Sequence, residues 1–336
     1  MCFADEPGGA PRPAPGVAVD PIALEPVDEV RITTLVENTF DALLVGSERV
    51  ARAGLGAGRV EAPQFLGGAA DVGLVAEHGF SALVTVRRGA TETALLFDAG
   101  LSPDALSLNA ARLGVDLGAV QGIVLSHGHP DHAGGLLGLP RLPMVLHPGA
   151  WTRRRFALPG GARELASLSR RALEAEGFSL VERRVPSLLV DGAVLITGEV
   201  DRTTDFELGM PAAHEAWTGD GWEPDPWVVD DQALVVHVRD RGLVVLTGCG
   251  HAGAVNIVRH AQRLTGVAEL HALVGGLHLG GAHVEPVIAP TVAALRALAP
   301  AVVVGGHCTG WKAQHALAAA LPDAYLPPSA GSTYRL

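Results

Sequence analysis

Three histidines and one aspartate lie within six consecutive positions, from His127 to His132, directly after a short apolar run. Imidazole nitrogens and carboxylate oxygens are ligands that zinc and similar ions take in proteins. An apolar run followed by a turn is typical of a buried strand that leads into a loop. We therefore predict a loop at a strand end in which His127 and His129 face one metal ion. Asp131 and His132 are predicted to face a second ion. So many residues of ligand type in six positions argue against the alternative, a polar surface loop with chance histidines.

The charge and the cysteine content limit the class of protein. The sequence has 25 basic and 36 acidic residues, a formal net charge of −11, which argues against a general binder of nucleic acid or anionic membranes. Its three cysteines form no disulfide framework and suit a reducing compartment. The first residues lack the regions of a signal peptide, and no apolar run could span a bilayer. We expect a cytoplasmic protein with no membrane or nucleic-acid partner; the sequence carries no signal for an oligomeric state.

Composition changes along the chain and suggests its organisation. Residues 1–27 are rich in Pro, Gly and Ala without periodicity, which predicts a flexible tail. Residues 28–336 are predicted to form one domain. Within it, residues 151–227 depart from the alternation of strands and helices, and the end of this stretch carries three tryptophans among Gly, Pro and acidic residues. A long stretch of this kind is usually a lid or binding loop, so we predict a lid-like insertion; a surface loop whose tryptophans pack on one another is the alternative.

The pattern of apolar residues predicts a layered α/β fold. Two strand-rich halves, each accompanied by helical segments, suggest two packed mixed sheets with helices on both outer faces. Strands are predicted at residues 30–36, 81–86, 93–97, 123–125, 144–146, 193–197, 231–238, 243–247, 271–274 and 301–304. Helices are predicted at residues 104–113, from about 133, and at 163–176, 251–264, 286–298 and 312–320.

Several motifs resemble those of a known family. SHGHPDHAGG, residues 126–135, matches the His-x-His-x-Asp-His motif of the metallo-β-lactamase superfamily. Asp98 resembles its strand-end aspartate, and His307 resembles its last histidine ligand. Thr-Gly-Cys, ending at Cys249, resembles its strand-end Thr-Gly-Asp with cysteine in place of aspartate.

Further segments resemble one subgroup, the 7,8-dihydropterin-6-methyl-4-(β-D-ribofuranosyl)-aminobenzene-5′-phosphate synthase-like proteins. They are EHGFSALV at 77–84, DDQALVV at 230–236, TGCGHAGAVN at 247–256, GGLHL at 275–279 and GHCTG at 306–310. The resemblance covers residues 31–334 and implies an αββα sandwich with metals at the edge between the sheets. It also implies that His127, His129, Asp131, His132 and His307 are metal ligands, and that Asp98 orients the loop through hydrogen bonds.

The sequence departs from the superfamily around the second predicted hairpin. No histidine precedes the strand that begins near Ala233; Asp230 and Asp231 stand there instead and are alternative ligands. Cys249 as a thiolate would favour zinc, and a buried small apolar residue is the alternative role for it. His251, two residues later, has the chemistry to supply the missing imidazole.

A few further residues are predicted to meet the substrate. His278 follows a buried strand and is a candidate for contact with substrate or metal, with a hydrogen-bonded structural role as the alternative. His278 and Asp131 are the candidate catalytic groups. In the predicted lid, residues 198–202 resemble a Gly-Glu-Ile-Pro-Arg-like segment of the subgroup, which makes Glu199 and Arg202 candidate substrate contacts, together with Trp222.

The ligand set predicts a metalloenzyme. Paired divalent ions lower the pKa of a bound water and stabilise charge that develops on a phosphoryl or carbonyl oxygen. The first prediction is a hydrolase of a small, anionic phosphorylated or ester-type substrate. The subgroup implies an alternative, a synthase whose metals bind the diphosphate of a dihydropterin donor while an aminobenzene ring displaces pyrophosphate. A redox role and a non-catalytic metal-binding role are further alternatives. The expected cofactors are one or two divalent ions, zinc foremost, with manganese or iron also compatible.

Overall fold

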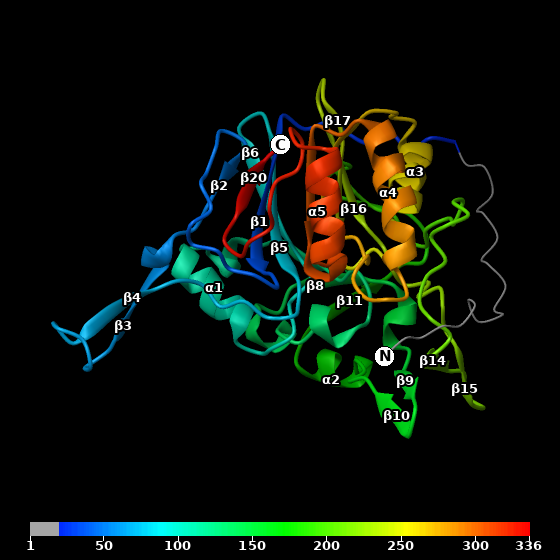
Figure 1. The fold of residues 1–336 in the computed structure, drawn as a ribbon, viewed down its shortest axis with the longest axis horizontal. Coiled ribbons are helices and arrows are strands. Elements are labelled where there is room, and N and C mark those ends of the chain that lie inside the picture. Colours follow the sequence, from blue (N-terminus) through cyan, green and yellow to red (C-terminus); the bar gives the residue numbers. More distant parts are fainter. Residues whose placement is uncertain (1–19) are drawn as a thin grey trace.

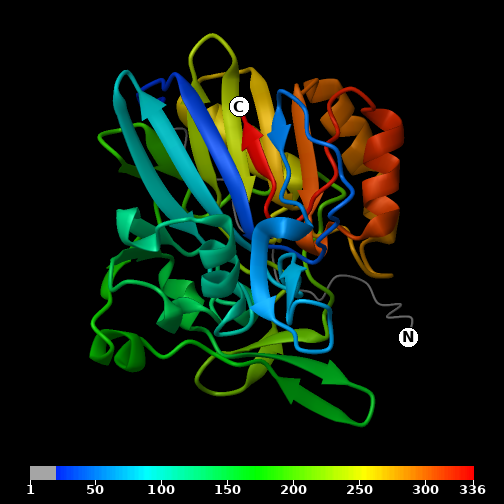
Figure 2. The same cartoon turned by 90° about the vertical axis from the view of Figure 1, so that its left-hand side faces the viewer.

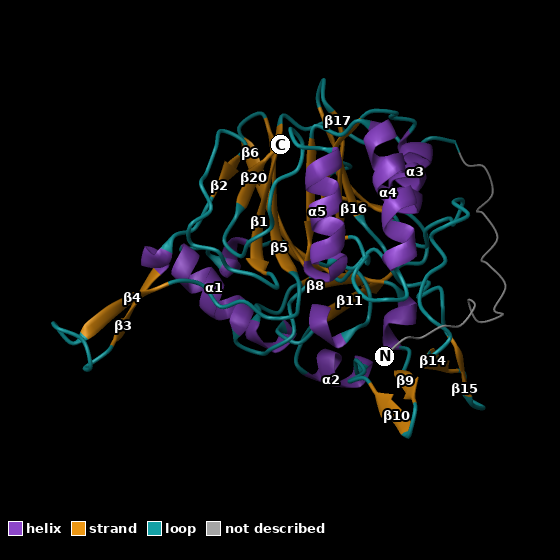
Figure 3. Ribbon diagram, in the orientation of Figure 1, coloured by secondary structure: helices purple, strands orange, loops and turns teal. Residues whose placement is uncertain are grey.

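Two β-sheets stacked face to face form the centre of the molecule (Figure 1). The computed structural model describes residues 20–336. The first sheet has eight strands in the order β11-β8-β7-β6-β5-β1-β20-β2, and the second has six in the order β12-β13-β16-β17-β18-β19. Helices lie on the outer face of each sheet, as Figure 3 shows. The predicted fold class is therefore confirmed.

The strands and helices are short, as expected of a layered sandwich. The first sheet contains β1 (Glu29–Val36), β2 (Val50–Ala51), β5 (Ser81–Arg88), β6 (Thr91–Phe97), β7 (Gly122–Val124), β8 (Pro143–Leu146), β11 (Ser179–Glu182) and β20 (Thr333–Arg335). The second contains β12 (Ser187–Leu189), β13 (Val194–Ile196), β16 (Leu234–Val238), β17 (Gly242–Thr247), β18 (Leu270–Gly276) and β19 (Val302–Gly306). The helices are α1 (Ala105–Leu113), α2 (Arg170–Ala175), α3 (Ala254–Thr265), α4 (Glu285–Leu298) and α5 (Trp311–Ala320), and a separate hairpin consists of β3 (Gly58–Glu61) and β4 (Ala69–Val72). Within residues 20–336, every helix falls short of the combined length and apolarity needed to cross a membrane.

Side chains on the two faces of each sheet pack into different cores. In β16, Leu234 and Val236 face the core between the sheets, whereas Val235 packs in the core that contains residues of α3, α4 and α5. On the first sheet, Leu96 and Ile123 pack with Leu106 of α1. Successive side chains of a strand point to opposite faces. A strand covered on both faces therefore consists almost entirely of apolar residues, which explains the unbroken apolar runs in the sequence.

Parallel strands bring the predicted site residues to one edge of the sandwich. β6, β7, β8 and β11 run parallel in the first sheet, and β17, β18 and β19 run parallel in the second. Neighbouring parallel strands end at the same edge, where open α/β sheets bind their ligands. Asp98 follows β6, the histidine loop follows β7, Cys249 follows β17, His278 follows β18 and His307 follows β19.

Two predicted helices differ from the structure. The helix expected from about residue 133 is replaced by short 3₁₀ turns, Pro130–His132 and Leu136–Gly138. Gly134 explains the difference, because a Cβ there would lie 1.7 Å from the carbonyl oxygen of Leu101, so the chain turns tightly against its neighbour. The helix expected at 163–176 shortens to α2, which begins after Ser169, whose hydroxyl caps it.

The predicted flexible tail, residues 1–27, is partly wrong. Residues 1–19 lie outside the described part of the chain. Residues 20–27 pack against the second sheet, where Leu24 and Val27 are buried. The Val27 N–H donates to the carbonyl oxygen of His237 at 2.9 Å. Apolar side chains spaced among the prolines give this segment a surface to bury, which its composition alone concealed.

The predicted insertion, residues 151–227, is too wide. β11, β12 and β13 fall within it but belong to the two main sheets. Two separate segments form a four-stranded sheet in the order β10-β9-β14-β15, with β9 (Arg154–Leu158), β10 (Gly161–Glu164), β14 (His214–Trp217) and β15 (Trp222–Pro224). We call it the arm sheet; it lies at the lower right of Figure 1 and at the bottom of Figure 2. The tryptophan-rich segment therefore has regular structure.

Candidate metal centre

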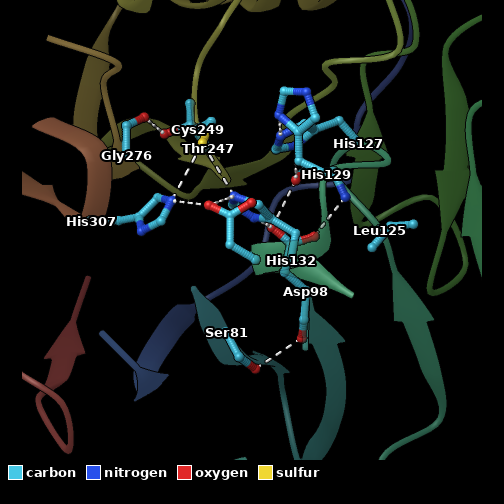
Figure 4. A network of polar contacts seen from close by, with 12 residues as sticks. Ser81, Asp98, Leu125, His127, His129, His132, Thr247, Cys249, Gly276 and His307 are labelled. Carbon is cyan, nitrogen blue, oxygen red and sulfur yellow. Dashed lines mark hydrogen bonds and ion pairs between the residues drawn. The ribbon is translucent and has the colours of Figure 1, made fainter. Parts of the chain in front are cut away.

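All the side chains predicted as metal ligands converge at the edge of the sandwich. Figure 4 shows five of them, His127, His129, His132, Cys249 and His307. Their donor atoms form two groups. The first group is His127, His129, His251 and Cys249, and the second group is Asp131, His132, His307 and Cys249. The histidine loop follows the first sheet, whereas the remaining donors follow strands of the second sheet. Each group therefore depends on both halves of the chain.

Three imidazole nitrogens face one another in the first group. Nε2 of His127 lies 3.1 Å from Nδ1 of His129, and Nε2 of His251 lies 3.2 Å from both atoms. Burial lowers the pKa of all three rings well below the ordinary value, which keeps them neutral. A tetrahedral zinc ion with Zn–N bonds of about 2.0–2.1 Å separates its nitrogen ligands by about 3.3 Å. The three nitrogens therefore fit one metal ion with little movement.

The second group combines a carboxylate, two imidazoles and a thiol. Sγ of Cys249 lies 3.2 Å from Nε2 of His132 and 3.4 Å from Nε2 of His307. Oδ2 of Asp131 lies 3.3 Å from Nε2 of His307 and 3.7 Å from Nε2 of His132. Donor atoms this close, with nitrogen, oxygen and sulfur combined, suit a transition-metal ion.

The electrostatics of the second group also favour a cation. Burial disfavours a charged His132, but the carboxylates of Asp131 and Asp98 outweigh it and raise the pKa of His132 to about 9. The pocket thus stabilises positive charge at this ring. A metal ion that binds the ring nitrogen would displace its proton and take over that charge.

Cys249 belongs to both groups and stands where the superfamily motif has aspartate. Its side chain is buried, and burial raises the pKa of the thiol. The thiolate therefore requires a neighbouring positive charge, which a bound metal ion supplies. The position of its sulfur between two sets of imidazoles favours the role of a shared ligand over that of a buried apolar residue.

Asp98 lies in the predicted orienting position. Its Oδ2 accepts hydrogen bonds from the hydroxyl of Ser126 and from Nδ1–H of His132, each at 2.7 Å. The Ser126 oxygen in turn accepts from Nδ1–H of His127 at 2.8 Å. Both rings are left with Nε2 lone pairs that face the donor groups. A Cβ at Gly248 would lie 2.2 Å from the Ser126 hydroxyl, so this network requires glycine at that position.

His307 is oriented by residues at the end of β1 that the sequence did not single out. Its Nδ1–H donates to Oδ1 of Asn38 at 3.0 Å, and its backbone N–H donates to the buried carboxylate of Glu37 at 2.6 Å. His307, Asp98 and His278 all have positive φ angles, of 47°, 59° and 46°. Backbone strain in non-glycine residues of this kind clusters at functional sites.

The two alternative ligands, Asp230 and Asp231, lie outside both donor groups. Asp230 forms an ion pair with Arg154 and accepts from the N–H of Gly128 at 2.9 Å. Burial would raise the pKa of Asp230, but Arg154 lowers it below the usual value. Asp231 accepts from the N–H of Ala252 at 2.8 Å. Both carboxylates therefore brace the loops that carry the candidate ligands.

A cavity of about 280 Å³ opens beside the donor groups. Its walls are mostly apolar, and among the described residues it has no Arg or Lys in its lining. The cavity is lined by His78, Leu101, His129, Pro130, Asp131, Phe156, Leu165, Met210, Cys249, His251, His278 and Cys308. The predicted catalytic groups, Asp131 and His278, are therefore both placed at this cavity.

The three predicted substrate contacts lie away from this lining. Glu199 accepts from Arg184 at 3.1 Å, beside His147. Arg202 is buried and donates to the carbonyl oxygens of His251 and Trp227, so it supports the loop that carries His251. Trp222 packs against other side chains of the arm sheet. Their contact with a substrate therefore stays a prediction, and this cavity gives it no support.

Sequence reasoning missed the residues by which the arm sheet reaches the site. Phe156 and Met210 line the cavity, and His214 lies with Nε2 3.3 Å from Nε2 of His129. None of them has a motif or a spacing that separates it from ordinary apolar or polar residues. Only the pairing of β9 with β14, which are distant in the sequence, brings Phe156 and His214 together, whereas Met210 lies on the segment that leads into β14.

Comparisons with known proteins agree with this geometry. The family model described as the metallo-beta-lactamase superfamily matches residues 77–262, more than half of the chain. The chain is 27% identical, over 71% of its length and 83% of the relative's, to 7,8-dihydropterin-6-methyl-4-(beta-D-ribofuranosyl)-aminobenzene-5′-phosphate synthase of Methanocaldococcus jannaschii. It is 28% identical, over 61% of its length and 74% of the relative's, to the uncharacterized protein MJ0448 of the same organism.

A solved structure, Tm1679, a metal-dependent hydrolase of the β-lactamase superfamily, shares the fold. It superposes with a TM-score of 0.68 and 24% identity, over 91% of this chain and 98% of that one. The resemblance of the histidine motif is thus confirmed by a match that extends well beyond it. The chain belongs to the metallo-β-lactamase superfamily.

Proposed function

We propose that this chain is a metal-dependent transferase that joins the nitrogen of an aromatic amine to a pterin-type methylene carbon and releases diphosphate. The apolar cavity beside the two donor groups carries the proposal. An anionic diphosphate would find positive charge only at bound metal ions and histidines there, because the described lining has no Arg or Lys. Flat rings would pack against Phe156, Leu165 and Met210. The name of the Methanocaldococcus jannaschii relative supports the same class of reaction.

The bonds and protons of such a transfer balance. The bond between the donor's methylene carbon and the diphosphate oxygen breaks, and its electron pair leaves with the diphosphate. A carbon–nitrogen bond forms to the amino group of the aminobenzene, and that nitrogen loses a proton. Metal ions bound at the donor groups supply positive charge to the leaving diphosphate. Asp131 and His278 line the cavity and are the candidates to receive the proton.

Hydrolysis is the second candidate, because the same donor groups could activate water. Cys249 argues against it as the main reaction. Sulfur is a softer and more strongly electron-donating ligand than a carboxylate oxygen. A thiolate ligand would weaken the ability of a bound ion to acidify water, whereas the binding of a diphosphate would need only the positive charge of the ion. The apolar cavity walls likewise favour an aromatic amine over water as the attacking partner.

The test uses metal-loaded protein with a 7,8-dihydropterin-6-methyl diphosphate donor and a 4-(β-D-ribofuranosyl)-aminobenzene 5′-phosphate acceptor. We expect one pyrophosphate and one coupled product per turnover, measured by a pyrophosphate assay and mass spectrometry, with both signals dependent on the acceptor. Phosphate or pyrophosphate released from the donor alone would indicate hydrolysis instead. Turnover confined to phosphoesters, lactones or β-lactams in a parallel panel would overturn the proposal.

A further inference from the structure

We propose that His214 of the arm sheet is a positioning residue for His129, and that the arm sheet thereby sets how tightly the first donor group binds its metal ion. His214 lies outside both donor groups and is fully buried. It belongs to β14, a strand outside the two main sheets. The role rests on the metal centre of the proposed function but not on the reaction that the centre catalyses.

A chain of hydrogen bonds fixes the proton positions on both rings. Nδ1 of His214 lies 2.8 Å from the carbonyl oxygen of Asp225, which can only accept, so Nδ1 carries the hydrogen. In a neutral ring, Nε2 of His214 is then an acceptor. It lies 3.3 Å from Nε2 of His129, which must therefore donate. The proton on Nε2 leaves a lone pair on Nδ1 of His129, the atom that faces His127 and His251.

This arrangement is what a metal-binding histidine needs. Such a ring commonly donates its second N–H to a fixed acceptor, which sets the tautomer and ring angle and makes the binding nitrogen more basic. Asp98 does this for His132, and Asn38 does it for His307. For His129 the acceptor comes from the arm sheet.

A second connection keeps the arm sheet in register with the metal loop. Arg154 of β9 donates to the carboxylate of Asp225 at 2.9 Å and pairs with Asp230. Asp230 accepts from the N–H of Gly128, between the first two histidines of the motif. The same arginine thus holds both the residue that orients His214 and the loop that carries His129.

The arm sheet also forms part of the cavity wall. Phe156 of β9 is the direct register partner of His214 in β14, and their ring centroids lie 5.3 Å apart. A shift of this strand pair would move the cavity wall and the His214 acceptor together. Metal affinity and the shape of the substrate cavity are therefore linked through one pair of residues.

The test compares the metal affinity of the variants His214→Leu and His214→Gln, measured by competition with a chromophoric chelator. Leucine removes the acceptor, and we expect a tenfold to hundredfold weaker affinity for one metal equivalent. Glutamine can accept from His129 with its oxygen and donate to Asp225 with its nitrogen, so we expect affinity within about threefold of the parent. The cobalt-loaded Leu variant should also show altered visible bands. Trp222→Leu, in the same sheet but outside the cavity lining, should bind metal like the parent.

Parental affinity in a folded His214→Leu variant would overturn the proposal, as would equal losses in the Leu and Gln variants. If the Leu variant does not fold, ¹H–¹⁵N spectra of the zinc-loaded parent decide the question. We expect the Nε2–H tautomer for His129 and the Nδ1–H tautomer for His214, and any other pair would contradict the proposal. These readouts need no substrate, so failure here is distinct from the absence of pyrophosphate release.

Discussion

Oδ2 of Asp98 lies 2.7 Å from Nδ1 of His132, and the same oxygen accepts the Ser126 hydroxyl that orients His127. One buried carboxylate thus sets the tautomers of histidines that belong to different donor groups. The metal loop and the end of β6 therefore act as one unit. Both metal positions should respond to a change at this single residue.

Asp98→Asn should weaken metal binding at both groups. An amide has one oxygen acceptor and cannot replace the charged carboxylate toward His132 and Ser126 together. We expect affinity to fall about tenfold to hundredfold, as for other residues that orient metal ligands. Metal content by mass spectrometry after dialysis against a weak chelator gives the result. Asp71→Asn, at an exposed ion pair with Arg59, serves as the control. Loss of only one equivalent would contradict the joint role of Asp98.

His251→Ala should remove one metal equivalent. It takes away one of three nitrogens that face a common point, and the remaining sulfur is shared with the second donor group. His315→Ala, on the exposed face of α5, should retain the parent's metal content. Metal stoichiometry by mass spectrometry distinguishes the two. Full metal content in the His251 variant would remove this residue from the ligand set.

Cys249→Asp should retain metal and activity. The carboxylate restores the residue type that the superfamily motif has at this strand end, and its oxygen can reach both donor groups from the sulfur's position. Cys249→Ala, which offers no donor atom, should lose at least one metal equivalent. Metal content and turnover are measured on both variants. An inactive, metal-free aspartate variant would mean that the site requires sulfur itself.

Phe156→Ala should raise KM roughly tenfold. The ring lines the cavity, and loss of an aromatic contact of this size costs about 1–2 kcal/mol in ligand binding. Trp222→Ala is the matched control, because it removes a larger ring from the same sheet outside the lining. Steady-state kinetics with the donor and acceptor proposed above provide the measurement. Equal KM values for the two variants would place the substrate elsewhere.

Asp231 should make the metal-free protein less stable as the pH rises from about 4 to about 7. Burial raises the pKa of its carboxyl from 3.8 to about 7, so the folded state holds the proton more tightly than the unfolded chain. The stabilisation from this carboxyl is complete below its pKa in the unfolded chain. It is lost as the pH rises through its pKa in the folded state, by at most about 4 kcal/mol. Urea unfolding of Asp231→Asn should show a stability gain over the parent that grows across this range. A stability difference between variant and parent that does not change with pH would contradict the raised pKa of Asp231.

Features of the fold and of the site could be predicted from the sequence where they depend on residues close together in the chain. The histidine motif needs six adjacent positions, and the placement of His251 followed from its distance of two residues from Cys249. The buried strands were recognisable because a strand covered on both faces is apolar throughout. Their layered packing followed from the number of such strands and helices.

The remaining features depend on contacts between distant segments. Phe156 and His214 meet only because β9 and β14 pair across more than fifty intervening residues. Arg202 looks like a free cation in the sequence, but it is buried and supports the backbone carbonyl of His251. Leu24 lies in a proline-rich segment whose composition indicates a tail, yet it completes a core. Local composition cannot report which partner surface a side chain will meet.

The division of the ligands between the two halves of the chain has a consequence for biosynthesis. The histidine loop emerges from the ribosome long before Cys249, His251 and His307. The strand β1 must likewise wait for β20, with which it pairs. A nascent chain cannot complete the first donor group before His251 has emerged, or the second before His307 has emerged. Metal loading is therefore a late event, and a chain truncated before His307 would bear an incomplete second group. Metal content would thus report whether the chain extends past His307.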